Sequence, residues 1–195
     1  MPETIPDHDR LYEVAEEQAG YFTTAQSYML GFSRPLLTYH TRTGKFIRVS
    51  HGIYRLTHFP ASPFEDLFIA WLRTGPHSVI SHESALSAYG LSDVLPGEIH
   101  VTVPRTASRR RRGIRLHTNR LNPEDVTWRE GLKVTTVPRT IADVAATGLA
   151  KEFVHQAIQE AMQRGLTDRE ALLEMASRRG GRASKLIAEA LAEER

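Results

Sequence analysis

A long stretch of the chain carries basic side chains and no acidic ones. No Asp or Glu occurs between Glu17 and Glu65, which leaves 47 residues without a carboxylate. The basic residues and histidines in this stretch are Arg34, Arg42, Lys45, Arg48 and Arg55, with His40, His51 and His58. Such side chains neutralise phosphates and release their counterions, which drives binding to nucleic acids. The charge distribution therefore indicates a nucleic-acid partner, although the net charge is only +2.

Side chains that could support catalysis lack the spacing that catalysis needs. Nine histidines occur without His-Glu-x-x-His or another metal-ligand spacing, and there is no cysteine. Ser81, His82 and Glu83 are consecutive, so on a helix their side chains point about 100° apart and cannot form a relay. Glu130 and Lys133 have the wrong spacing for a restriction-type nuclease. We expect no catalytic residue, no metal site and no cofactor.

The elements that would position the basic residues follow a known plan. Residues 21–56 predict a short helix, a tight turn, a second helix and a β-hairpin, and residues 10–19 predict a helix that backs them. Thr23 or Thr24 can cap the short helix, and Ser33 can cap the second. In a winged helix-turn-helix the second helix enters the DNA major groove and the hairpin forms the wing.

Helical periodicity divides the second helix into two faces. Leu37 and Thr41 are expected to face the backing helices, with Leu36 or His40 beside them. The opposite face is then expected to contact DNA through Arg34, Pro35, Thr38, Tyr39 and Arg42. We select Arg34 for a base contact, because a guanidinium can bridge O6 and N7 of guanine.

Further DNA contacts are expected around this helix. Gln26 and Ser33, at the starts of helices, are expected to contact phosphates. Lys45, Arg48 and His51, in and beside the wing, are expected to hold the DNA backbone or reach the minor groove. The alternative interpretation is a basic face that only meets solvent.

A second window without acids lies between Glu98 and Glu124. It holds the run Arg109, Arg110, Arg111 and Arg112, together with Arg105, Arg115 and Arg120. This run is either a solvated loop, an auxiliary nucleic-acid contact, or a docking surface for an acidic partner or its RNA. The sequence does not rank these alternatives.

The length of 195 residues has room for one large domain or two small ones, and the order of the predicted elements favours two. Residues 1–60 are expected to form the winged helix-turn-helix, and residues 61–195 an α+β domain with a small sheet and C-terminal helices. Ser62 to Glu65 reads as a capping box that starts a helix over 64–73, expected to form the core of the second domain. Strands are expected over 98–103, 114–117 and 132–137, and Arg139 and Asp143 are expected to form a structural ion pair.

No apolar run is long enough to span a membrane, and the N-terminus lacks the pattern of a signal peptide. We expect a cytoplasmic protein without a membrane partner.

Two blocks of sequence resemble the AbiEi family of antitoxins. The first includes Thr24-Ala25-Gln26, Gly31-Phe32-Ser33-Arg34 and His51-Gly52-Ile53-Tyr54-Arg55, and is similar to the winged-helix domain of the family. The second includes Ser81-His82-Glu83-Ser84-Ala85-Leu86, Ile99 to Pro104, and Val126 to Thr140 with Asp143. The two blocks cover most of residues 10–147, and the last fifty residues match only loosely.

The resemblance implies a DNA-binding antitoxin with two tasks. It would repress its own toxin–antitoxin operon by binding inverted repeats in the promoter, as a monomer in solution or a dimer on DNA. It would also counteract a cognate AbiEii-like nucleotidyltransferase toxin. The alternatives are a winged-helix regulator or adaptor unconnected to a toxin, and a nucleic-acid-processing enzyme.

Overall fold

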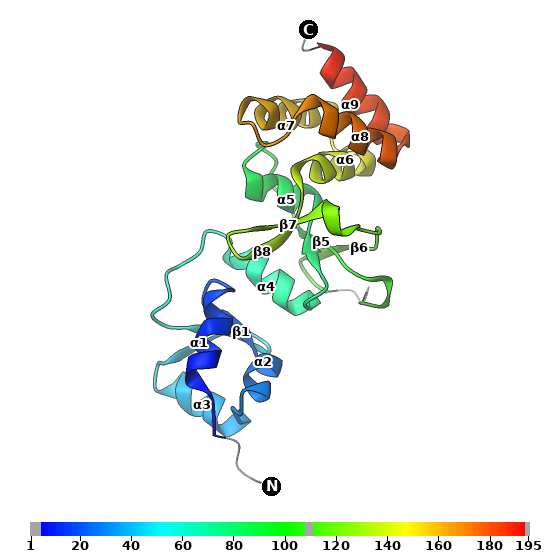
Figure 1. Ribbon diagram of the computed structural model, residues 1–195. Helices are drawn as coiled ribbons and strands as arrows, with labels where there is room; N and C mark the ends of the chain where they lie inside the picture. The colour runs from blue at the N-terminus through cyan, green and yellow to red at the C-terminus, as the bar shows by residue number, and fades with distance from the viewer. Residues whose placement is uncertain (1–4, 108–110, 194–195) are drawn as a thin grey trace. The chain divides into compact units, whose positions relative to one another are not determined.

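The chain divides into two compact α+β units, which are described separately. The computed structural model describes residues 5–107 and 111–193 (Figure 1). The first unit comprises Met1–Pro76 with Glu130–Leu132, and the second comprises His77–Arg129 with Lys133–Arg195.

The first unit is a winged helix-turn-helix with an additional helix. It contains α1 (His8–Glu16), β1 (Tyr21–Thr23), α2 (Thr24–Met29), α3 (Arg34–Arg42), β2 (Phe46–Ser50), β3 (Ile53–Leu56) and α4 (Glu65–Thr74). The strands form one antiparallel sheet in the order β1-β3-β2. The predicted helices and hairpin are confirmed, whereas β1 was not predicted because its three residues are too few to show alternation.

A small apolar core holds the first unit together. Its buried members come from α1, α3, the turn before α3 and two strands of the sheet: Leu11, Ala15, Phe22, Phe32, Leu37 and Phe46. The rings of Phe22 and Phe46 meet edge to face, with centroids 5.0 Å apart. This core buries one face of α3 and therefore leaves the opposite face of that helix to solvent.

Helix α4 belongs to the first unit, which differs from the predicted role of residues 64–73 in the second domain. Phe68 is fully buried and stacks on Tyr21 of β1, with ring centroids 5.8 Å apart. The predicted capping box is also wrong, because Phe64 is the N-cap and makes no side-chain capping bond. The Ser62 hydroxyl instead accepts a hydrogen bond from the backbone N–H of Phe64 at 3.1 Å.

The second unit begins with a five-stranded sheet and ends in helices. Its strands are β4 (Val79–Ile80), β5 (Ile99–Thr102), β6 (Ile114–His117), β7 (Val126–Arg129) and β8 (Leu132–Thr135), in the spatial order β6-β5-β4-β8-β7. Its helices are α5 (His82–Tyr89), α6 (Val137–Thr147), α7 (Lys151–Gln163), α8 (Arg169–Arg179) and α9 (Gly181–Glu193), with short 3-10 turns at Arg105–Ala107 and Pro123–Asp125. Strands β4 and β7 were not predicted.

Strands β5 and β6 run parallel, pairing Ile99 with Ile114 and Thr102 with His117. Parallel neighbours end at the same edge of a sheet, so the segments that follow β5 and β6 begin side by side. Strand β4 joins this pair to strands β8 and β7, because it is antiparallel to β5 and parallel to β8.

A buried network of charges joins α6 and α8 to the segment that precedes β7. Arg139 donates to Asp143 at 2.9 Å and to Asp125 at 2.8 Å, so the predicted ion pair is confirmed and has a second partner. Arg179 donates to Asp143 at 2.9 Å, and Arg178 donates to Asp125 at 2.5 Å. Both aspartates are almost fully buried, and a buried carboxylate is costly unless it is paired. These arginines provide the opposite charges and the hydrogen bonds that the two carboxylates need.

In the parts of the chain that the structure describes, no helix is long and apolar enough to cross a membrane.

Asp143→Asn is expected to destabilise the second unit by about 3–5 kcal/mol, because it leaves two arginines beside a neutral amide. Glu124→Gln is the matched control, since Glu124 is exposed and pairs with Arg178 at 3.0 Å, and it is expected to cost about 1 kcal/mol or less. Urea denaturation followed by circular dichroism measures both. Equal costs for the two variants would contradict the dependence on buried charge.

Candidate nucleic-acid interface

Helix α3 presents a polar face that its own sequence shapes. Ser33 caps the helix by accepting a hydrogen bond from the N–H of Leu36 at 3.3 Å, and Pro35 lies in the first turn, where it needs no donor. Leu37 and His40 are buried on the inner face. The helix therefore has the two faces that the periodicity predicts.

The outer face of α3 is exposed and forms one shallow hollow. Its volume is about 740 Å³, and its lining consists of the predicted outer residues with one addition: Arg34, Pro35, Thr38, Tyr39, Arg42 and Thr43. Tyr39 is 59% exposed, a high value for an aromatic side chain. Two guanidinium groups, two hydroxyls and an exposed ring on one helix form the kind of surface that contacts phosphates and base edges.

The wing lies next to α3 in the chain and adds exposed basic groups. Lys45, Arg48 and His51 are all exposed. The hairpin pairs Arg48 with Tyr54 and Ser50 with Ile53, so the register shifts at Val49. A shift of this kind increases the local twist of a hairpin. Arg55 is occupied differently, because it donates to the carbonyl of Phe59 at 2.6 Å and lies 5.8 Å from the centre of the Tyr21 ring.

Gln26, which was expected to contact a phosphate, forms a capping box at the start of α2. Its Oε1 accepts from the N–H of Thr23 at 2.8 Å while Thr23 accepts from the N–H of Gln26, which is a capping box. Its Nε2 donates to Gln18 at 3.0 Å. Both ends of the amide already have partners, so the capping role explains Gln26 without a phosphate.

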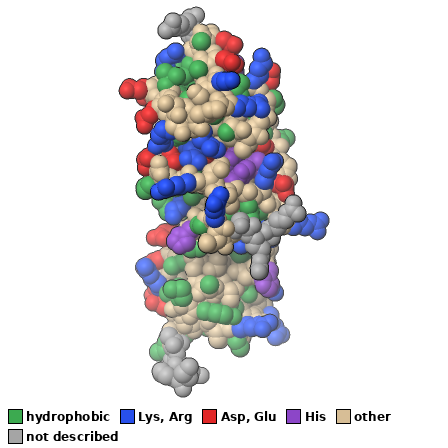
Figure 2. Space-filling model, turned by 90° about the vertical axis from the view of Figure 1, so that its right-hand side faces the viewer, with side chains coloured by type: hydrophobic (Ala, Val, Ile, Leu, Met, Phe, Trp, Pro, Cys, Tyr) green, Lys and Arg blue, Asp and Glu red, His purple; other side chains and the backbone are tan. Residues whose placement is uncertain are grey.

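The second basic window is only partly described. Arg109 and Arg110 lie outside the described residues, whereas Arg111 is half-buried and Arg112 is exposed. Figure 2 shows Lys and Arg side chains gathered, with histidine beside them, over part of the second unit on one face. The role predicted for this run stays a prediction.

Three histidines of the second unit meet in a cluster that their spacing did not predict. The rings of His82 and His117 stack with centroids 3.5 Å apart, and His100 lies 5.1 Å from His117. Ser81 accepts a hydrogen bond from Thr102 and lies 2.9 Å from Nδ1 of His82. The residues are brought together from β5, β6 and the start of α5.

The geometry expected for Ser81 and His82 was wrong. Helix α5 begins at His82, and Ser81 is its extended N-cap, so the two side chains bond instead of pointing apart. Both residues are fully buried, and Glu83 lies near His100 at 4.0 Å. A serine in this position has no access to a substrate, so the pair does not resemble a hydrolytic site.

The histidine cluster is held neutral. Burial lowers the pKa of His82 to about 2, helped by its neighbours His117 and His100. Burial likewise lowers the pKa of His100 and of His117 to about 4, with Arg115 adding repulsion at both rings. Among the described residues, no group of histidines and carboxylates is arranged to hold a metal ion.

Comparisons with known proteins agree with this architecture. Residues 9–57 match the family model described as "Transcriptional regulator, AbiEi antitoxin", and residues 78–193 match "AbiEi antitoxin C-terminal domain". A search of curated proteins found no match. A crystal structure of the RV2827C protein from Mycobacterium tuberculosis is similar over 94% of this chain and 75% of that chain, with a TM-score of 0.55 and 15% identity. That identity supports the fold alone.

The winged helix-turn-helix and the two matched domains define a transcriptional regulator of the antitoxin class. The chain belongs to the AbiEi antitoxin family, as its two sequence blocks predicted. The matched families are regulators and antitoxins rather than enzymes.

Stability is expected to fall as the pH is lowered from about 6.5 towards 4. The histidine cluster stays neutral in the folded state, whereas the unfolded chain takes up protons near pH 6.5. The contribution of these histidines to the free energy of unfolding is therefore fully present only above that pH. His117→Phe retains a stacked ring and should reduce the loss of thermal stability between pH 7.5 and 5. His51→Gln, on the exposed wing, is the control, and its loss of thermal stability between pH 7.5 and 5 should equal that of the wild type. A wild-type midpoint that does not fall over this range would contradict the expectation.

Proposed function

We propose that the protein represses its own toxin–antitoxin operon by binding inverted repeats in the promoter. The observation that carries the proposal is the outer face of α3, where Arg34, Thr38, Tyr39 and Arg42 are exposed together on a helix of the recognition type. The DNA-binding set comprises Ser33, Arg34, Pro35, Thr38, Tyr39 and Arg42, with Lys45, Arg48 and His51 of the wing. Gln26 is left out because its amide is already bonded.

The roles within this set follow from position. Arg34 is in the first turn of α3, the part of a recognition helix that reaches base edges, so it reads a guanine. Lys45 and Arg48 hold phosphates beside the groove. Two copies bind the two halves of an inverted repeat, because the twofold symmetry of such a site matches that of a protein pair.

We further propose that the protein counteracts a cognate AbiEii-like nucleotidyltransferase toxin. The match of residues 78–193 to the C-terminal domain of AbiEi antitoxins supports this role. The second unit has its own core and its own charge network, so this task does not require the outer face of α3. A regulator or adaptor unconnected to a toxin is the competing function, and salt-insensitive partner binding without DNA affinity would favour the adaptor.

Arg34→Ala is expected to weaken binding to the DNA upstream of the gene by roughly 1–3 kcal/mol while changing binding to random DNA little, because it removes a base contact. Arg48→Ala should weaken binding to both DNAs and reduce the salt slope by about 0.9, because it removes one phosphate contact. Mobility-shift titrations at several salt concentrations measure these effects. Arg73→Ala, exposed on α4, is the control and should change neither.

Wild-type binding to the upstream DNA that is no tighter than to random DNA would refute the proposed repression.

The double variant Arg34→Ala/Arg48→Ala is expected to lose repression of a promoter reporter and still restore growth of cells that express the toxin. The reason is that both substitutions lie in the first unit and not in the domain assigned to neutralisation. Reporter output and growth are measured in the same strain. Failure to restore growth, with the variant folded and present at wild-type level, would contradict this division of tasks.

A further inference from the structure

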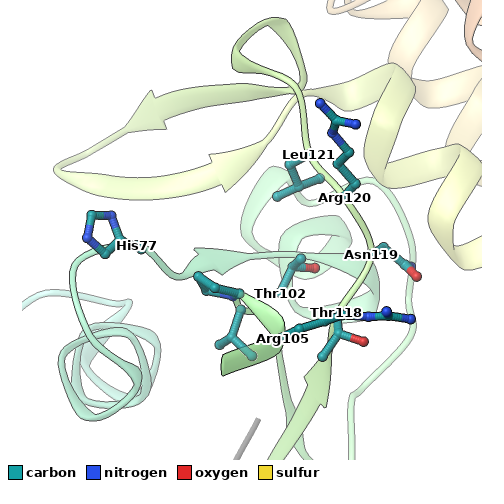
Figure 3. A pocket seen from close by; sticks show the side chains of 9 residues that line it. His77, Thr102, Arg105, Thr118, Asn119, Arg120 and Leu121 are labelled. Atoms are coloured by element: carbon teal, nitrogen blue, oxygen red, sulfur yellow. The ribbon is translucent and has the colours of Figure 1, made fainter. Parts of the chain in front are cut away.

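A hollow of about 650 Å³ lies at the carboxyl ends of the parallel strands β5 and β6 in the second unit. Its walls are the segments that leave these strands, residues 102–105 and 118–121, with His77 (Figure 3). In open α/β sheets, ligands bind in the crevice outside the carboxyl ends of parallel strands, and this hollow lies at the corresponding ends of β5 and β6. The volume lies within the usual range for small-molecule sites, roughly 300–1,000 Å³.

The lining of the hollow suits an anion. Arg105 and Arg120 supply positive charge from the two walls, and Thr118 and Asn119 supply hydrogen-bond donors between them. None of the lining residues is acidic, and the sequence holds no carboxylate between Glu98 and Glu124. Guanidinium groups bind phosphate oxygens through paired, charge-assisted hydrogen bonds.

The backbone of Arg120 is held by the buried charge network. Its carbonyl accepts a hydrogen bond from Nη2 of Arg139 at 3.2 Å, and Arg139 is anchored by Asp125 and Asp143. A second hollow of about 300 Å³ shares Asn119 and Arg120 and is lined further by Arg178 and Arg179. The buried charge network therefore holds one wall of the site.

The inner side of the hollow is polar, and a strained residue that does not line it lies behind Thr102. Thr102 is buried, lines the hollow and donates to Ser81, which contacts His82. His82 has φ of +52°, a conformation that costs energy in a residue with a side chain. The Nε2 atom of this fully buried ring has no hydrogen-bond partner. Backbone strain clusters at functional sites, and here it is linked to the lining of the hollow through Ser81 and Thr102.

We propose that this hollow binds a free nucleoside triphosphate. Arg105 and Arg120 hold the phosphates, and the apolar surface of Pro104 and Leu121 receives the base. A small concave site lined from two loops fits a single nucleotide better than a duplex, which needs a convex element such as a helix. The proposal is independent of the DNA binding assigned to α3.

Isothermal titration calorimetry of the full chain with ATP in the absence of divalent metal tests the site. ATP is expected to bind once per chain, and Arg105→Gln and Arg120→Gln are each expected to raise the Kd about tenfold or more, since each removes a charged phosphate contact. Arg115→Gln is the matched control, because Arg115 is exposed on β6 in the same acid-free window and does not line the hollow. It should change the Kd less than twofold.

Further ligands and variants separate nucleotide binding in this hollow from a non-specific attraction of anions to the basic surface. Inorganic triphosphate should compete with ATP, adenosine should bind more weakly than ATP, and Arg34→Ala should leave ATP binding unchanged. Arg120→Lys keeps the charge and should restore part of the affinity that Arg120→Gln loses. Thermal unfolding confirms that each variant is folded, and mobility shifts with the upstream DNA monitor the first unit separately.

Three results would overturn the proposal. They are absence of ATP binding at millimolar concentration, equal weakening by the three Arg→Gln variants, and binding of a short single-stranded oligonucleotide in the hollow where ATP does not bind. Equal weakening would show that a general positive field, rather than this hollow, attracts the ligand. Loss of the mobility shift alone would concern the proposed repression and not this site.

Discussion

The second unit depends on the pairing of two buried aspartates with arginines from α6 and α8. A carboxylate in the interior is tolerated only when its charge is matched and its oxygens are bonded, and Asp125 and Asp143 each meet two arginines. These bonds connect the segment before β7, the helix after β8 and a helix near the C-terminus. The sheet and the helical layer therefore have to be assembled together, since either one alone leaves buried charge unpaired.

In the first unit, an apolar constraint decides which residues are available for function. Leu37 packs into the core with Phe32 and Phe46, and this contact sets the rotation of α3 about its axis. The outer residues follow from that rotation. His40 is part of the same arrangement, because its ring lies 4.9 Å from the ring of Phe46, and burial lowers its pKa. Burial on one face and charge on the other thus produce the candidate interface.

Strong local signals could be predicted from the sequence. The two faces of α3, the turn before it and the hairpin follow from periodicity and from glycine, proline and capping residues. The pair Arg139 and Asp143 follows from a spacing of four on a helix. Long-range contacts could not be predicted in this way. Arg178 and Arg179 reach their aspartates across more than 30 residues, and His82 meets His117 only because β5 and β6 are neighbours.

The outer face of α3 contributes almost nothing to the interior of the first unit. Arg34, Pro35, Thr38, Tyr39 and Arg42 are exposed, while the core takes Leu37 and His40 from the same helix. Substitutions on that face therefore cost the fold little, so its sequence can change extensively while the first unit remains folded.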